Sequence, residues 1–86
     1  MLSDIGFEIV LASPPKYNDL VAEIYFEGKF VLLINQEKGA GVFEVETPGC
    51  GLAESEVIRR VCLSGLLVAM QSACERLSGK ANHRSD

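Results

Sequence analysis

The chain has no tryptophan, a single histidine and no apolar segment long enough to cross a membrane. A membrane-spanning helix needs about 20 consecutive apolar residues, and the apolar run 61–70 is interrupted by Ser64 and Gly65. The apolar segment 5–12 contains Glu8 and is not preceded by a lysine or arginine, so it does not match a secretory signal peptide. We therefore expect a cytoplasmic protein with no membrane partner.

Groups that carry catalysis or bind metals are scarce. The only histidine, His83, lies in a polar tail that offers no means of holding it against a nucleophile. Cys50, Cys62 and Cys74 are 12 residues apart, a spacing that matches no chelating pattern. Cys62 and Cys74 lie in apolar runs and are predicted to be buried thiols, and the odd number fits a reducing cytoplasm. The sequence thus predicts no enzyme, no metal site and no cofactor.

Negative charge is concentrated in the middle of the chain. The net charge of the whole sequence is −4, but residues 19–56 contain eight acidic and two basic residues, a local balance of −6. This surface disfavours nucleic acid as a partner and favours a basic protein. Solubility alone would also explain it.

The first half of the chain has the patterns of antiparallel strands. The segment 6–12 alternates apolar and polar residues with the period of a half-buried strand. Two apolar runs, 20–26 and 29–36, flank Glu27-Gly28, which predicts a hairpin with a two-residue turn. The segment 42–47 alternates again and predicts a fourth strand, with Phe43 and Val45 inward and Glu44 and Glu46 outward.

Regular pairing about this turn predicts which hairpin residues share a face. Both faces are largely apolar, so a single helix would leave one of them uncovered. This predicts a second copy or another protein on the uncovered face, and a homodimer is the expected resting state. The predicted first face consists of Ala22, Ile24, Phe26, Val31 and Leu33, and the second of Val21, Glu23, Tyr25, Phe30, Leu32 and Ile34.

The second half predicts one helix. Ser64 is a suitable N-cap and Gly79 a suitable C-terminal stop, and apolar residues recur between them at helical spacing. The segment 56–63 is either a strand or the opening of this helix, and its β-branched residues favour a strand. We expect an α+β domain over residues 1–79, with a meander-like antiparallel sheet of four to five strands and one C-terminal helix packed on one face. Residues 80–86 form a polar, poorly ordered tail.

One charged residue stands out on the predicted second face. Glu23 lies between Val21 and Tyr25, and a carboxylate on an apolar face needs a partner. It lies at the edge of this face, or an arginine at position 59 or 60 pairs with it, or it is presented to another protein. A third possibility is acid/base or ligand chemistry by the carboxylates, which a deep pocket at Glu23 would favour.

The hairpin AEIYFEGKFVLLINQE at residues 22–37, followed by the sequence FEVE at 43–46 and ACERL at 73–77, resembles predicted immunity proteins of bacterial polymorphic toxin systems. Members of that family bind a cognate toxin in the cytoplasm and neutralise it. The resemblance implies inhibition by direct binding, and the alternative is a homo-oligomeric structural domain. The candidate partner-binding residues are Glu23, Asn35, Gln36, Glu37, Glu44 and Glu46, some of which could equally fix the geometry of the hairpin.

Overall fold

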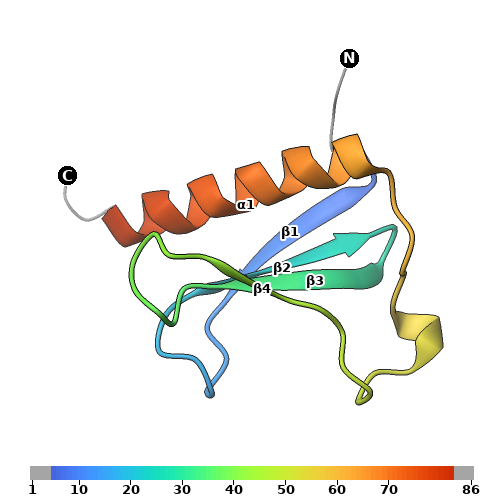
Figure 1. Ribbon diagram of the computed structural model, residues 1–86, viewed down its shortest axis with the longest axis horizontal. Coiled ribbons are helices and arrows are strands. Elements are labelled where there is room, and N and C mark those ends of the chain that lie inside the picture. The colour runs from blue at the N-terminus through green and yellow to red at the C-terminus, as the bar shows by residue number, and fades with distance from the viewer. Residues whose placement is uncertain (1–4, 83–86) are drawn as a thin grey trace.

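The computed structural model describes residues 5–82, which form four strands, a short 3-10 helix and one long α-helix. The strands pair in one antiparallel sheet in the order β1-β2-β3-β4, and α1 lies along one side of it (Figure 1). The predicted α+β fold is confirmed, with four strands. The elements are β1 (Phe7–Ala12), β2 (Val21–Phe26), β3 (Lys29–Asn35), β4 (Glu44–Glu46), η1 (Glu54–Glu56) and α1 (Leu63–Asn82).

The predicted hairpin turn is confirmed. Glu27 and Gly28 both have positive φ, 51° and 85°, as in the two-residue turns whose twist matches that of the flanking strands. The Glu27 amide donates a hydrogen bond to the Gly6 carbonyl at 2.8 Å, which ties the start of β1 to the turn. Gly6 has a φ of 90°, and a Cβ there would lie 2.7 Å from Cε1 of Phe26, so this position accepts no larger residue without rearrangement.

A β-bulge changes the predicted faces of the hairpin. The register shifts between Ile24 and Tyr25, so that Tyr25 pairs with Phe30 and Ile24 with Leu32, with Val31 as the additional residue. An extra residue in one strand reverses the alternation beyond it. The prediction that placed Leu32 and Ile34 with Glu23 is therefore wrong, and Leu33 is the residue opposite Glu23.

The core lies between the sheet and α1. Helix α1 packs on β1 and β2, and alanines at two positions of its inner surface are fully buried, which allows close approach to the strands. Burying a side chain of the size of Ile24 stabilises the fold by about 1.5–3 kcal/mol. The buried cluster consists of Ala22, Ile24, Val31, Leu32, Ile34, Ala69, Ala73 and Leu77.

The predicted fifth strand is wrong. Val57 forms only an isolated parallel bridge with Phe30, and the Ile58 amide donates to the Phe30 carbonyl at 3.1 Å. Beyond this bridge the chain leaves the sheet edge, because it must pass to the other side of the sheet to begin α1 (Figure 1).

Helix α1 is longer than predicted at both ends. It begins at Leu63, where the Cys62 carbonyl accepts the first bond from the Leu66 amide at 2.9 Å. It continues through Gly79 to Asn82, because a glycine costs only about 1 kcal/mol relative to alanine inside a helix. Residues 80–82 of the predicted tail are thus helical, while the rest of it, including His83, lies outside the described residues. Within residues 5–82, no helix has the length and apolarity required to cross a membrane.

Candidate functional site

The side of the sheet opposite α1 is a hollowed surface, which we call the open face. Figure 1 shows the loops 13–20 and 47–53 projecting from the sheet on this side, away from the helix. Between them lie strand residues whose side chains alternate with those of the core. The loops therefore form two walls, and the sheet forms the floor.

Two adjoining cavities make up this cleft, with volumes of about 640 and 300 Å³. They share four residues, Glu23, Phe30, Leu33 and Leu52. Tyr25, Lys29 and Glu56 line the larger cavity, and Tyr17 and Glu46 line the smaller one. The cleft thus has an apolar floor with carboxylates around it.

Each tyrosine in the cleft donates its hydroxyl to a carboxylate. The Tyr17 hydroxyl lies 2.8 Å from Oε1 of Glu46, and the Tyr25 hydroxyl lies 3.0 Å from Oε1 of Glu23. Burial, strengthened by the bond to Glu46, raises the pKa of Tyr17 to about 12. Burial and then the bond to Glu23 likewise raise the pKa of Tyr25. Both hydroxyls therefore stay protonated near neutral pH and act as donors.

Glu23 and Glu46 are the two predicted site residues that the fold brings into the cleft. The prediction that Arg59 or Arg60 pairs with Glu23 is wrong: Tyr25 is its hydrogen-bond partner, and Arg59 instead pairs with Glu54 at 2.6 Å.

Asn35 and Gln36 fix the geometry of the strand ends. Both are 4% exposed. The side-chain amide of Asn35 donates through Nδ2 to Oε2 of Glu46 at 2.6 Å, and Oδ1 of Asn35 accepts from the backbone amide of Glu37. Gln36 donates to the Leu20 carbonyl at 3.3 Å. These two side chains thus use their hydrogen-bonding groups within the fold.

Glu37 and Glu44 lie outside the cleft. The Glu37 carboxylate is exposed and accepts hydrogen bonds from the Asn18 amide, the Asn18 side chain and the Asp19 amide, at 3.0–3.2 Å. It therefore holds the end of the loop 13–20. Glu44 forms an exposed ion pair with Lys38 at 3.5 Å.

The sequence reasoning missed the cleft residues contributed by loops. Tyr17 and Leu52 belong to segments with no periodic pattern, and nothing local indicates that they approach the sheet. Phe30 and Leu33 were assigned to different faces, because regular pairing does not predict the bulge. Tyr25 could have been predicted as a site residue, because it lies two residues from Glu23 on the same strand and hence on the same face.

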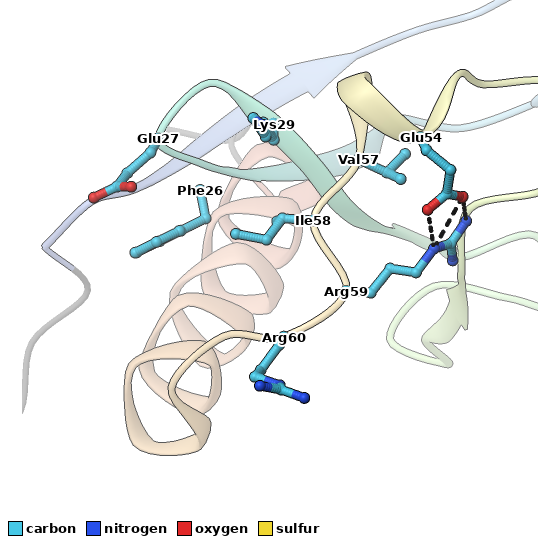
Figure 2. A pocket seen from close by; sticks show the side chains of 8 residues that line it. All are labelled: Phe26, Glu27, Lys29, Glu54, Val57, Ile58, Arg59 and Arg60. Atoms are coloured by element: carbon cyan, nitrogen blue, oxygen red, sulfur yellow. Dashed lines mark hydrogen bonds and ion pairs between the residues drawn. The ribbon is translucent and has the colours of Figure 1, made fainter.

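A further pocket of about 570 Å³ lies at the end of the hairpin (Figure 2). Its apolar part is formed by Phe26, Val57 and Ile58. The Arg59 guanidinium is held by Glu54, and Arg60 points away from the other labelled side chains. The charged groups do not converge on one point, so this pocket is a weaker candidate than the cleft.

One of the three cysteines, Cys62, differs from its predicted environment. Cys50 and Cys62 are exposed and Cys74 is half-buried, so the prediction of a buried Cys62 is wrong. The Cys62 sulfur lies 3.2 Å from the Ser64 hydroxyl oxygen, and this contact, followed by the backbone amides of residues 65 and 64, lowers the pKa of the thiol. Cys62 is exposed because it directly precedes the first residue of α1. No group of three potential metal ligands gathers in the described part of the chain.

The geometry of the cleft suits a binding surface: the wall formed by the loop 13–20 is fixed by hydrogen bonds, the floor is apolar and the polar groups are donors and acceptors in defined positions. The chain matches no protein-family model, no curated protein and no solved structure.

Proposed function

We propose that this chain is a non-catalytic protein-binding module that binds its partner in the cleft on the open face. The observation that carries the proposal is the apolar lining of the cleft, with Phe30 and Leu33 on the floor and Leu52 on a wall, together with the carboxylates around it. Apolar surface in a concave site gives affinity, and surrounding charge guides the approach of a partner of opposite charge.

The preorganised wall formed by the loop 13–20 supports this proposal. The hydrogen bond from Tyr17 to Glu46 joins the loop 13–20 to β4, and Glu37 holds the end of the same loop. A surface whose groups are already fixed loses less conformational entropy on binding. The cleft is therefore suited to tight association with one partner.

For the partner, we propose a bacterial toxin that is neutralised by direct binding in the cytoplasm. This part rests on the resemblance of residues 22–37 to immunity proteins and on the acidic surface, which complements a basic toxin. The resembling segment supplies part of the floor of the cleft through Tyr25, Phe30 and Leu33.

The test is co-expression with the toxin domain encoded beside this gene. We expect the chain to restore growth and to form a complex with the toxin, and Leu33→Arg to abolish both, because it places a charge on the apolar floor. The matched control is Val42→Arg, at an exposed position that does not line the cleft. Absence of an adjacent toxin gene would contradict the toxin assignment, and protection by a folded Leu33→Arg variant would contradict the binding surface.

Charge reversal tests the electrostatic part separately. Glu44→Lys, outside the cleft, should slow association while leaving the fold intact, because complementary charge at a distance acts mainly on the rate of encounter. Glu23→Lys, inside the cleft, should in addition speed dissociation. Glu37 is unsuitable for this purpose, since its carboxylate holds the loop 13–20. Association measured by stopped-flow at two salt concentrations should become less salt-dependent in the reversed variants.

The second candidate is a homo-oligomeric structural domain. It is favoured by Leu63 and Leu67, which are 69% and 54% exposed and lie one turn apart on α1. Two such patches can meet across a two-fold axis. Light scattering at micromolar concentration tests this: a dimer that Leu63→Glu dissociates supports self-association through the helix, and a stable wild-type monomer contradicts it.

A further inference from the structure

Glu23 occupies the point where the two cavities of the cleft meet, since it lines both. Its carboxylate is half-buried and accepts one hydrogen bond, from the Tyr25 hydroxyl. The ion pairs found in residues 5–79 join Lys38 to Glu44 and Arg59 to Glu54, so neither includes Glu23. A half-buried carboxylate gains from a cationic partner, because part of its hydration has been removed.

The charges around the cleft favour such a partner. Four carboxylates and two lysines line the two cavities. Lys16 is placed over the ring of Tyr17, with its nitrogen 5.4 Å from the ring centre, and Lys29 lies at the turn end of β3. The lining therefore carries an excess of negative charge, which raises the local concentration of a cation.

Of the four carboxylates, Glu23 is the one that lines both cavities. Both oxygens of Glu46 accept hydrogen bonds, one from Tyr17 and the other from Asn35. Glu27 and Glu56 are exposed and line the larger cavity alone. Among residues 5–79, Glu23 accepts a hydrogen bond through Oε1 alone, so Oε2 can accept from a bound group. Glu23 thus combines partial burial with capacity for a ligand.

The surroundings of Glu23 suit a guanidinium better than an ammonium. Tyr25 and Phe30 are in edge-to-face contact, with ring centres 5.6 Å apart, and Leu33 and Leu52 complete the apolar lining. A guanidinium is planar, weakly hydrated and able to stack on aromatic rings while it donates two parallel hydrogen bonds to a carboxylate. An ammonium keeps its hydration more strongly and loses more on entering such a site.

We infer that the cleft binds an arginine side chain of the partner protein. Its guanidinium donates to Glu23, and its methylene groups pack on Phe30, Leu33 and Leu52. This inference rests on the proposed function and specifies the contact that the binding surface makes.

The test uses small probes on the whole chain, followed by amide NMR. The probes are the N-acetyl methylamides of arginine, lysine and citrulline, citrulline being the uncharged analogue of arginine with nearly the same shape. We expect the arginine probe to shift the amide signals of Tyr25, Phe30, Leu33 and Leu52 and to saturate with a millimolar dissociation constant. The citrulline probe should shift none of them. Lysine should bind several-fold more weakly than arginine.

Two matched variants assign the contact. Glu23→Gln should weaken arginine binding at least about fivefold, as expected for the loss of a charge-assisted hydrogen bond, and Tyr25 can still donate to the glutamine oxygen. Glu75→Gln makes the same charge change on an exposed position of α1 and should leave binding unchanged. Thermal unfolding of both variants confirms that they fold.

Three results would overturn the inference: equal binding of citrulline, equal binding of lysine, or an unchanged affinity in Glu23→Gln. The proposed function can be judged separately with Leu33→Arg. If that variant loses the toxin complex while Glu23→Gln retains it, the cleft binds the partner without an arginine contact. If Leu33→Arg retains the complex, the binding surface itself is misplaced.

Discussion

The two sides of the sheet are held together by different forces. On the helix side, aliphatic residues pack against the alanines of α1 and are almost completely removed from water. On the open face, the hydrogen bond from Tyr17 to Glu46 holds the loop 13–20 against β4, and Tyr25 and Asn35 donate to carboxylates within the sheet beside a partly exposed floor. The helix side therefore supplies most of the stability, and the open face keeps apolar area available for a partner.

The largest expected difference between the two sides is found at two adjacent residues of β3. Ile34 is 1% exposed on the helix side, and Leu33 is half-buried on the open face. Ile34→Ala should lower the free energy of unfolding by about 2–5 kcal/mol, and Leu33→Ala by about 1 kcal/mol because less area is lost. Urea unfolding measures both. Equal losses would contradict the shifted register.

A smaller effect is expected where hydrogen bonds hold the wall of the cleft. Tyr17→Phe removes the hydrogen bond to Glu46. This should lower the free energy of unfolding by about 1–2 kcal/mol, because a hydrogen bond to a charged group contributes somewhat more than one between neutral groups. Denaturant unfolding at neutral pH measures this, with Tyr25→Phe as the comparison on the same face.

The same tyrosine predicts a pH dependence. An unfolded tyrosine ionises near pH 10, whereas the folded pKa of Tyr17 is about 12. Between these values the folded state retains a proton that the unfolded state has released, so the contribution of Tyr17 is complete below pH 10 and is lost as the pH rises through about 12. Absorbance titration of tyrosinate checks this, and ionisation of Tyr17 near pH 10 would contradict it.

Thiol reactivity distinguishes the start of α1 from its packed middle. Cys62 is exposed and has a lowered pKa, while burial, followed by the charge of Glu75, raises the pKa of the half-buried Cys74. Native labelling should therefore modify Cys62 and exposed Cys50 before Cys74. Ser64→Ala should slow labelling of Cys62 by about two- to threefold, since the thiolate fraction falls. Faster reaction of Cys74 would mean that α1 is packed differently.

The smallest effect is expected at the exposed ion pair between Arg59 and Glu54. The side chains are 53% and 76% exposed, so solvent screens the pair and it contributes little to stability. Arg59→Ala should therefore leave the midpoint of urea unfolding almost unchanged. A clear fall in this midpoint would indicate that the segment after η1 depends on the pair.

The sequence was sufficient to predict the strands β1 to β3, the turn at Glu27-Gly28 and the presence of one C-terminal helix. These elements depend on local signals: alternation, a glycine that accepts positive φ, and apolar residues at helical spacing. The segment after Glu56 was mispredicted because β-branched residues favour a strand only where an edge is available along its length. Here Val57 reaches the edge of β3 for one bridge before the chain turns to the helix.

The candidate site was only partly predictable. Glu23 was identified by a local anomaly, a charge within an apolar strand, and it does lie in the cleft. Tyr17 and Leu52 reach the cleft through long-range contacts of loops, which have no sequence period. Asn35 was identified as polar, but its bond to Glu46 forms only when β3 and β4 pair, so the sequence alone does not show that the side chain is buried.

The bulge at Val31 determines how this strand tolerates changes in length. Deleting Val31 would remove the additional residue and leave a regular hairpin in which Leu32 still pairs with Ile24 and Leu33 with Glu23. If the strand instead lost the bulge without losing a residue, Val31 would pair with Ile24 and every later side chain of β3 would change sides. In a related sequence, a one-residue gap at this position would therefore signify the same binding surface, although the pattern of hydrophobic residues along the strand would look different.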